Sequence, residues 1–400
     1  MADRSAVRVR DALESLDSLV PLLAANAATV DREARFPAEN LDALRAAGLL
    51  GLLVPEDHGG QGLGLADLVT VAQRLAGGCL STAMILAMHC QQVDVLVRHA
   101  GPRLRAELLP RIAAGEVYLA SVTTEAGTGG HLLSADASLE RGGADGAATA
   151  EASIRFRRDA PVVTGAAHAD GFLITMRDGP DQGEHAVSLV YADRADLDIE
   201  RYGAWNPMGM RATESGAVRL AGAIRPDQVV GPPGGFRAVA LDSMIPVGHL
   251  AWSACWLGAA RAVFSALVRH LARDGRTDVA SPLVRERVAR IRLDLELVSA
   301  YLGRVREEVE RVRARAAPCD APSLQIHLNS LKIAASELTY RAVDRMVQLA
   351  GMSVGYSADS AIPLERALRD LRSAALNYSN DRLWTATGGL CLLDRKVELL

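Results

Sequence analysis

The chain has 400 residues, of which 23% are charged, and its formal net charge is −4 at pH 7. Acidic and basic residues are interspersed rather than gathered in blocks, so the chain lacks the basic surface with which proteins attract nucleic acid. Since 400 residues exceed what one hydrophobic core usually supports, we expect a globular enzyme of two or three subdomains and not a small binding module.

The remaining composition suggests an intracellular protein. The five cysteines are scattered and have no CxxC spacing, which argues against a disulfide framework and a structural zinc site. The charged N-terminal segment lacks the apolar core of a signal peptide, and no later stretch has roughly 18 apolar residues without a charge. We therefore expect a cytoplasmic protein with no bound metal and no membrane partner. Of the 44 lysine and arginine residues only Lys332 and Lys396 are lysines, which is typical of a GC-rich genome.

The first predicted elements are helices. From about Arg8 to Ala114, apolar residues recur at three- and four-residue spacing, which predicts amphipathic helices. A proline and several glycines at 54–64 interrupt them, because these residues forbid a continuous helix there. We therefore place an α-helical domain at residues 1–116.

Strands are predicted next. Between about Val117 and Val230, short apolar runs are separated by clusters of Gly, Asp and Pro, a pattern typical of strands. No long helical period interrupts these runs, so we expect an antiparallel barrel or sandwich at residues 117–230 rather than alternating strands and helices.

The helical period returns at residues 231–400. Long stretches such as 283–316 carry charges every third or fourth residue with Leu, Val and Ile between them, which predicts a four-helix bundle. The order of helices, strands and helices predicts an α+β fold of three domains.

Four short motifs carry a resemblance to a known family. They are VPEDHGGQG at 54–62, SVTTEAGTGG at 121–130, GMRATESG at 209–216, and QLAG at 348–351 followed by Arg369-Asp370. In this order and spacing they resemble the acyl-CoA dehydrogenase superfamily across nearly the whole chain. The resemblance implies the fold order already derived from the pattern.

The resemblance also implies an FAD cofactor. A flavin ring needs hydrogen-bond partners at fixed positions, and a strand edge followed by a glycine-rich loop supplies backbone N–H groups at close approach. By resemblance Thr164 hydrogen-bonds flavin N5, while Gln348 and Gly351 receive the adenine end from a neighbouring subunit, which implies a homodimer or homotetramer. The cofactor-contacting residues implied in this way are Thr123, Thr124, Gly129, Gly130, Thr164, Arg276, Gln348 and Gly351.

The chain departs from this family at the catalytic base. The usual reaction removes an α-proton with a glutamate while a hydride leaves for flavin N5. Counting from Arg369-Asp370, the position of that glutamate holds Tyr378, and the alternative position used by other members falls near Gly248. Loss of a general base typically costs about 10²–10⁴ in rate, so ordinary α,β-desaturation is in question. An alignment slip would bring Asp381 into play.

Other substitutions indicate a rebuilt pocket. Gly130 replaces a serine that touches the thioester, and Val162 replaces a tryptophan beside the flavin. We predict that Tyr378, His249 and His89 are the catalytic acid–base groups. A histidine at position 89 would shuttle a proton near neutral pH; alternatively it is held by a hydrogen bond in the core.

Three functions fit these residues. The first is a flavin-dependent oxidoreductase acting on a thioester of CoA or an acyl carrier protein, such as a hydroxyacyl extender unit in secondary metabolism, where His or Tyr accepts the alcohol proton. The second is a flavin monooxygenase of the same fold, a hydroxylase or N-oxygenase, which needs no α-base. The third is a flavin-fold protein kept as a scaffold.

Overall fold

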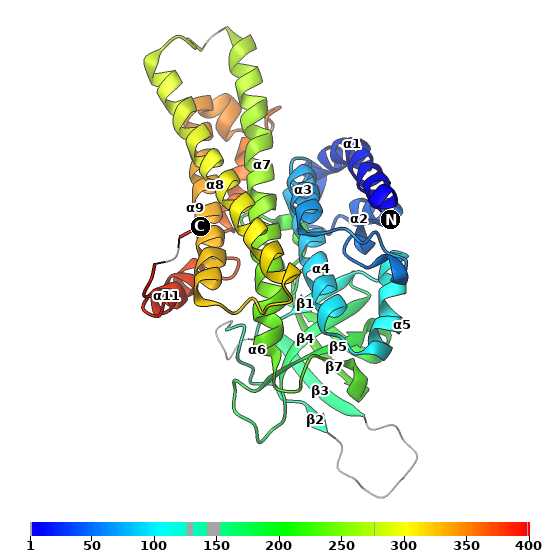
Figure 1. Ribbon diagram of the computed structural model, residues 1–400. Coiled ribbons are helices and arrows are strands. Elements are labelled where there is room, and N and C mark those ends of the chain that lie inside the picture. The colour runs from blue at the N-terminus through cyan, green and yellow to red at the C-terminus, as the bar shows by residue number, and fades with distance from the viewer. Residues whose placement is uncertain (1, 126–130, 142–152, 276, 398) are drawn as a thin grey trace, which may run out of the picture.

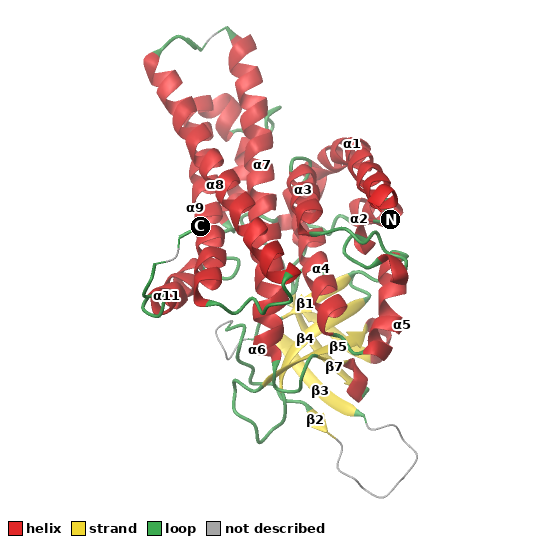
Figure 2. Cartoon of the chain, in the orientation of Figure 1, coloured by secondary structure: helices red, strands yellow, loops and turns green. Residues whose placement is uncertain are grey.

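The computed structural model describes residues 2–125, 131–141, 153–275, 277–397 and 399–400. Helices come first, strands occupy the middle of the chain, and long helices complete it (Figures 1 and 2). This order confirms the predicted α+β fold class.

The N-terminal region consists of helices, in which α3 and α5 pack against α4 while α1 packs against α3 and α2. Its elements are α1 (Ala2–Glu33), α2 (Ala38–Ala46), the 3₁₀ turns η1 (Leu49–Gly51) and η2 (Glu56–His58), α3 (Leu65–Ala76), α4 (Leu80–His99) and α5 (Pro102–Ala113). The predicted break between helices lies at η2 and its flanks, where a Cβ on Gly60 would lie 2.1 Å from the Val54 carbonyl oxygen. Only glycine allows that approach of two backbone segments.

The strands form two four-stranded sheets. The first has the order β1-β4-β5-β8 and comprises β1 (Leu119–Val122), β4 (Gly171–Arg177), β5 (Val187–Asp193) and β8 (Val229–Val230). The second has the order β2-β3-β7-β6 and comprises β2 (Glu140–Arg141), β3 (Ile154–Ala160), β7 (Ala217–Ile224) and β6 (Leu197–Tyr202). Within the described residues the sheets do not close into a barrel.

One strand pair corrects the expectation of a purely antiparallel arrangement. β1 and β4 are parallel, with Leu119 opposite Gly171, whereas the other pairs of named strands are antiparallel. Parallel neighbours require a crossover connection. Here the crossover runs from β1 through β2 and β3 of the second sheet and back to β4 in the first sheet. The pattern of apolar residues does not reveal this path.

The C-terminal region is dominated by three helices of about equal length. It contains α6 (Phe236–Val239), the π turn η6 (Ala240–Met244), α7 (Ile245–Asp274), α8 (Pro282–Ala314), α9 (Pro322–Gly351), the π turn η7 (Met352–Tyr356), α10 (Leu364–Arg372) and α11 (Asn380–Cys391). α7 packs against α3 and α4 as well as α8 and α9, so it joins the two helical regions. Buried Asp294 of α8 pairs with Arg341 and Arg345 of α9, each at 2.6 Å.

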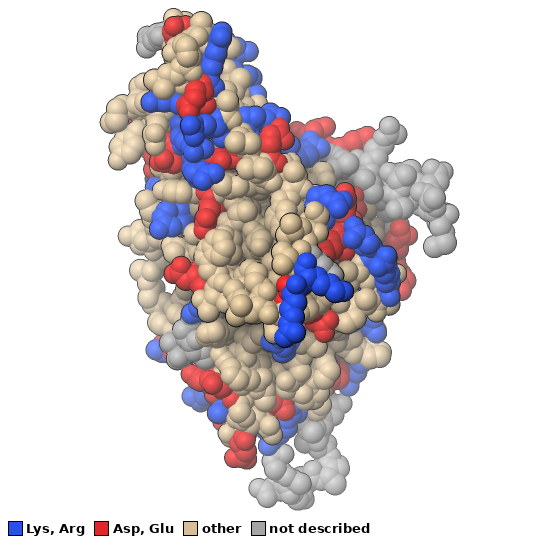
Figure 3. Space-filling view, turned by 60° about the vertical axis from the view of Figure 1, so that its left-hand side comes forward, with Lys and Arg blue, Asp and Glu red and all other residues tan. Residues whose placement is uncertain are grey.

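The charged residues on the surface and the two long apolar helices are arranged as in a protein whose apolar helices are packed inside it. On the face in Figure 3, Lys and Arg side chains alternate with Asp and Glu around a broad uncharged area. α4 and the continuous stretch Phe236–Asp274 are long and apolar enough to cross a membrane, but 89% and 72% of their apolar windows are buried inside the molecule. Their composition suits helices that are apolar all round because neighbours surround them.

Two of the sequence motifs meet where η4 (Arg211–Thr213) approaches α10. A Cβ on Gly209 would lie 2.1 Å from the Arg369 carbonyl oxygen, so glycine is required at this contact. The buried Asp370 carboxylate accepts a 2.6 Å hydrogen bond from the Met210 N–H, and Arg369 pairs with Asp31 of α1. Burial raises the pKa of Asp370 to about 7.

We predict that Asp370→Asn stabilises the protein in a pH-dependent way. Because its folded pKa is raised, Asp370 favours the native state below about pH 4, and this contribution is lost as pH rises toward 7. An asparagine still accepts the Met210 N–H but avoids ionisation, so the variant should gain about 2–4 kcal/mol over wild type at pH 8 and almost nothing at pH 4. Thermal unfolding of both proteins at the two pH values, with Asp381→Asn as control, measures this. Equal gains at both values would contradict it.

Candidate functional site

A cavity of about 310 Å³ lies where the three regions meet. α4 supplies one wall, β1 and the segments after it supply a second, and η6 with α7 supplies a third. The turn between α10 and α11 closes the fourth side. The lining residues are Met88, Gln91, Tyr118, Leu119, Ala120, Ser121, Thr123, Thr124, Leu132, Val162, Thr164, Met244, Ile245, His249, Trp252, Leu376, Asn377, Tyr378, Ser379 and Arg382.

His249 of α7 is a buried neutral imidazole in this wall. Its Nδ1–H donates to the Leu328 carbonyl at 3.1 Å, which fixes the tautomer and leaves Nε2 as an acceptor with no hydrogen bond to the described chain. Burial and the nearby positive charge of Lys332 lower the pKa of His249 to about 3. The group therefore accepts hydrogen bonds at neutral pH but is a weak base.

Tyr378 lies beside His249, with 6.2 Å between their ring centroids. Its backbone has φ = 52°, an uncommon conformation for a residue other than glycine, and its carbonyl accepts a hydrogen bond from Lys332. Burial raises the pKa of its phenol, so the ring is uncharged at neutral pH. The structure thus brings together two of the three predicted catalytic residues.

The threonines predicted to contact the cofactor share the strand-side wall. Thr164 exchanges a 2.9 Å hydrogen bond with Ser215, and the Thr124 hydroxyl donates to the Val162 carbonyl at 2.8 Å. The Thr123 hydroxyl has no hydrogen bond to the described residues, so it is available to a ligand. Three of the predicted cofactor residues therefore line one cavity.

A buried ion pair holds this wall in place. Arg158 of β3 lies 2.6 Å from the Glu125 carboxylate, and that carboxylate also accepts the backbone N–H groups of Asp136 and Ala137. Arg158 further donates to the Thr124 carbonyl at 3.2 Å. This pairing fixes the chain on both sides of the glycine-rich segment.

The space beside Gly248, the alternative position of the catalytic base, is filled by the side chain of Gln91. A Cβ at Gly248 would lie 2.4 Å from Nε2 of Gln91, a cavity-lining residue whose amide donates to the Met244 carbonyl at 2.6 Å. A glutamate at position 248 would therefore displace Gln91. Among the described lining residues no side chain is a carboxylate, and Asp381 does not line the cavity.

Other predicted residues lie elsewhere. His89 does not line the cavity; its Nε2–H donates to the Leu50 carbonyl at 2.9 Å and its Nδ1 accepts the Leu119 N–H at 3.1 Å. Burial lowers its pKa to about 4, so it is neutral and both of its ring nitrogens are engaged in hydrogen bonds.

Gln348 hydrogen-bonds Asp344 on α9, and Gly351 is exposed at the end of that helix; neither residue lines the cavity. The remaining predicted cofactor residues, Gly129, Gly130 and Arg276, lie outside the described residues.

The sequence analysis missed several polar groups at this site. Trp252 is 9% exposed, and its indole N–H has no hydrogen-bond partner among the described residues; the amide nitrogen of Asn377 is also buried without a partner in that part of the chain. Arg382 adds a half-buried cation. A buried unpaired donor costs roughly 1–3 kcal/mol, and both donors belong to residues that line the cavity. A tryptophan within an apolar helix pattern gave no signal of this.

Comparison with known families identifies the class of protein. The family described as acyl-CoA dehydrogenase, N-terminal domain, matches residues 19–116, and acyl-CoA dehydrogenase, C-terminal domain, matches residues 235–376. These ranges cover more than half of the chain. The chain therefore belongs to the acyl-CoA dehydrogenase family, an oxidoreductase family, which confirms the resemblance.

The names of individual relatives describe different reactions. Mitochondrial isobutyryl-CoA dehydrogenase of Dictyostelium discoideum is 24% identical, over 86% of this chain and 78% of that protein. L-evernosamine nitrososynthase of a Micromonospora species is 28% identical, over 91% of this chain and 85% of that protein. KijD3, solved with FMN and dTDP-3-amino-2,3,6-trideoxy-4-keto-3-methyl-D-glucose, has the same fold, with a TM-score of 0.83, 24% identity, and coverage of 98% of this chain and 95% of that one.

We predict that His89→Leu destabilises the fold without changing the chemistry of the cavity. The substitution leaves the Leu50 carbonyl and the Leu119 N–H buried without partners, which should cost about 2–4 kcal/mol. Urea unfolding measures the loss, and FMN titration of the folded variant should give an unchanged Kd. A stable variant with altered FMN binding would indicate a direct role at the site.

For Trp252→Phe we expect the reverse pattern. Phenylalanine keeps an aromatic ring but removes the unpaired indole N–H. FMN should therefore bind about 2- to 10-fold more weakly, which corresponds to the net free energy of one hydrogen bond. The melting temperature should stay constant or rise, because the substitution removes a buried donor that has no partner in the described residues. Quenching of FMN fluorescence gives the Kd, and Trp384→Phe on the exposed face of α11 is the matched control. Equal effects of the two substitutions would contradict this role.

Proposed function

We propose that this chain is a flavin-dependent monooxygenase. The observation that carries the proposal is the acid–base character of the cavity. The imidazole in its wall is that of His249, whose pKa of about 3 makes it too weak a base to remove a carbon-bound α-proton. Tyr378 is an uncharged phenol, and Gln91 fills the space next to the alternative base position. Oxygen transfer needs no such base.

The residues present fit a flavin. Its ring is flat and carries carbonyl and ring-nitrogen acceptors, and the residues that line the cavity include Trp252, Asn377 and Thr123, whose side chains carry hydrogen-bond donors. Known relatives support this assignment, since KijD3 was solved with FMN. A bound flavin supplies the electrons that reduce O₂ and allows one oxygen atom to pass to the substrate.

The chain itself orients the substrate and excludes water. Apolar side chains of Met88, Leu119 and Ile245 make much of the wall, which lowers the local dielectric around the reacting groups. Nε2 of His249 accepts a hydrogen bond from a substrate N–H or O–H, because its other nitrogen is fixed as a donor to Leu328. An amine or hydroxyl-bearing ring is thus held beside Tyr378. The nitrososynthase relative makes an amine the substrate class to test first.

Oxidation of a hydroxyacyl thioester is a second candidate. The same open nitrogen of His249, next to the Tyr378 phenol, is placed to accept a hydrogen bond from an alcohol, and the family includes a CoA-named dehydrogenase. Under this proposal the substrate is a thioester of CoA or of an acyl carrier protein. FAD rather than FMN, assembly as a homodimer or homotetramer, a place in secondary metabolism and a cytoplasmic location remain predictions.

One experiment separates the two reactions. The protein is supplied with FMN reduced by a separate NADH-dependent reductase, ¹⁸O₂, and a set of amino sugar nucleotides and indoles. We expect products that carry one ¹⁸O atom, measured by mass spectrometry, and we expect His249→Phe to lower the yield about 10-fold or more because the substrate loses its hydrogen-bond acceptor. Boiled protein controls for uncatalysed oxidation by reduced flavin.

One outcome would contradict the monooxygenase proposal and support thioester oxidation. If hydroxyacyl-CoA thioesters bleach the FAD-loaded protein under anaerobic conditions, and no substrate gains ¹⁸O, the thioester oxidation is correct and the oxygenase assignment is wrong.

A further inference from the structure

Lys332 of α9 is a buried lysine directed at the back of the cavity wall. Its side chain is inaccessible to solvent, with 0% exposure. Its Nζ donates to the carbonyls of Ala374 and Tyr378, both at 3.0 Å, and to Oδ1 of Asn380 at 2.7 Å. Ala374 and Tyr378 belong to the segment that joins α10 to α11, and Asn380 is the first residue of α11.

The geometry of this contact explains the choice of lysine. An ammonium carries three N–H donors on one atom, and here three acceptors converge on that atom. A guanidinium is planar and spreads its donors over three nitrogens, so it cannot make the same contact. Lys332 is one of only two lysines among the 44 basic residues of the chain.

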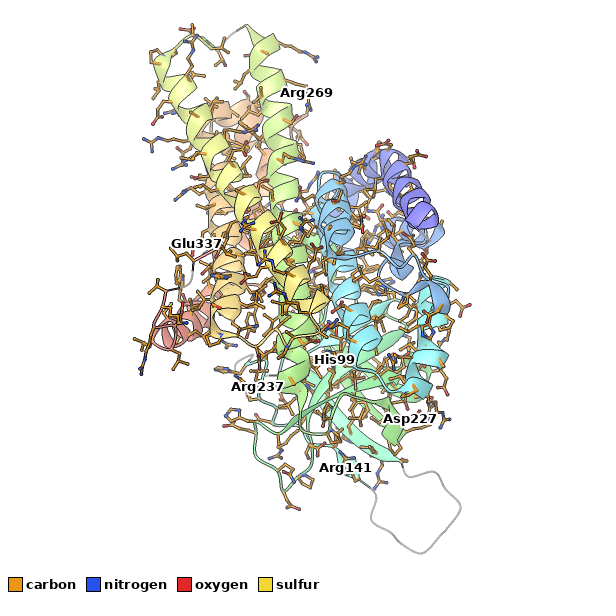
Figure 4. The ribbon with its side chains drawn as sticks, viewed as in Figure 1. His99, Arg141, Asp227, Arg237, Arg269 and Glu337 are labelled. Atoms are coloured by element: carbon orange, nitrogen blue, oxygen red, sulfur yellow. The ribbon has the colours of Figure 1, made fainter. Side chains whose placement is uncertain are left out.

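Burial makes the contact costly, and its surroundings offset that cost. Nζ lies 5.7 Å from the centre of the Trp256 ring. The Asn380 amide that accepts from Lys332 also donates to Glu337 at 3.1 Å, and Glu337 lies on α9 (Figure 4). Burial lowers the pKa of Lys332 to about 7, and the charge of Glu337 opposes that shift. A buried ammonium is retained where hydrogen bonds satisfy all of its protons.

The tethered segment is the one that shapes the cavity. Leu376, Asn377, Tyr378 and Ser379 line it, between the first and last of the three acceptors. Tyr378 has a positive φ of 52°, a conformation that costs roughly 1–3 kcal/mol and persists only where neighbouring contacts hold it. The Lys332 bond to the Tyr378 carbonyl is such a contact.

We propose that Lys332 is a positioning residue, which fixes residues 374–380 so that Asn377 and Tyr378 face the cavity. It does not touch the reacting atoms. The inference rests on the proposed function only in that this cavity is the active site, and it holds for either candidate reaction.

The test measures local opening of the segment. Hydrogen exchange of the intact protein, without flavin or substrate, is compared for wild type, Lys332→Met and Lys332→Arg, with Lys396→Met as the matched control at an exposed lysine. Both substitutions at 332 should speed exchange at least 10-fold for peptides covering 373–383, and exchange in α8 should change less than 2-fold. The control should match wild type throughout.

A spectroscopic readout separates positioning from general stability. Lys332→Met should alter the visible circular dichroism of bound FMN, because the groups facing the ring have moved, while Lys396→Met should leave it unchanged. If the variants at 332 do not fold, Asn380→Ala removes one of the three acceptors and should give a smaller increase in exchange over the same peptides.

Two outcomes would overturn the proposal. One is unchanged exchange at 373–383 in Lys332→Met or Asn380→Ala, and the other is full retention of wild-type exchange and dichroism in Lys332→Arg. Because exchange is measured without substrate, these outcomes are independent of the ¹⁸O experiment, which tests the reaction alone.

Discussion

The cavity depends on buried polar side chains that hold distant backbone segments together. His89 joins α4 to both η1 and β1, Arg158 and Glu125 hold the chain around the glycine-rich segment, and Lys332 holds the α10–α11 turn. Each of these groups is surrounded by apolar packing, where an unmet hydrogen bond is expensive. The walls of the cavity come from three regions of the chain, so these cross-links set their relative positions.

The same constraint shapes the chemistry. His249 is neutral because it is buried near the Lys332 charge, and its tautomer is set by a single backbone carbonyl. Under the proposed function, a neutral imidazole and an uncharged phenol orient the substrate by hydrogen bonds rather than by removing a carbon-bound proton. The family is named for dehydrogenation, and it also includes a relative whose name describes nitroso formation. The three regions of the fold enclose a cavity of about 310 Å³, and the proposed reaction follows from the groups that line it.

Particular residues show where sequence reasoning succeeded and where it failed. Tyr378, His249 and the threonines were located by short motifs whose spacing fixes the local chain, and the structure brings them to one cavity. His89 was indistinguishable in sequence from a catalytic histidine, because its two backbone partners lie 39 and 30 residues away. Sequence reasoning made no prediction for Trp252, and it marked Lys332 only as an unusual residue type, since only the fold reveals an indole N–H without a partner in the described residues, or two backbone carbonyls and an amide oxygen around one ammonium.

By itself the sequence determined the order of helices and strands, the family, and the absence of a glutamate at either expected base position. Periodicity and local motifs carry that information because they depend on neighbouring residues. Tertiary structure alone decided that β1 and β4 run parallel, that Gln91 occupies the space beside Gly248, and which histidine faces the cavity. Those features depend on contacts between segments far apart in the chain, and burial, which sets both the pKa values and the unpaired donors, exists only once those segments have packed.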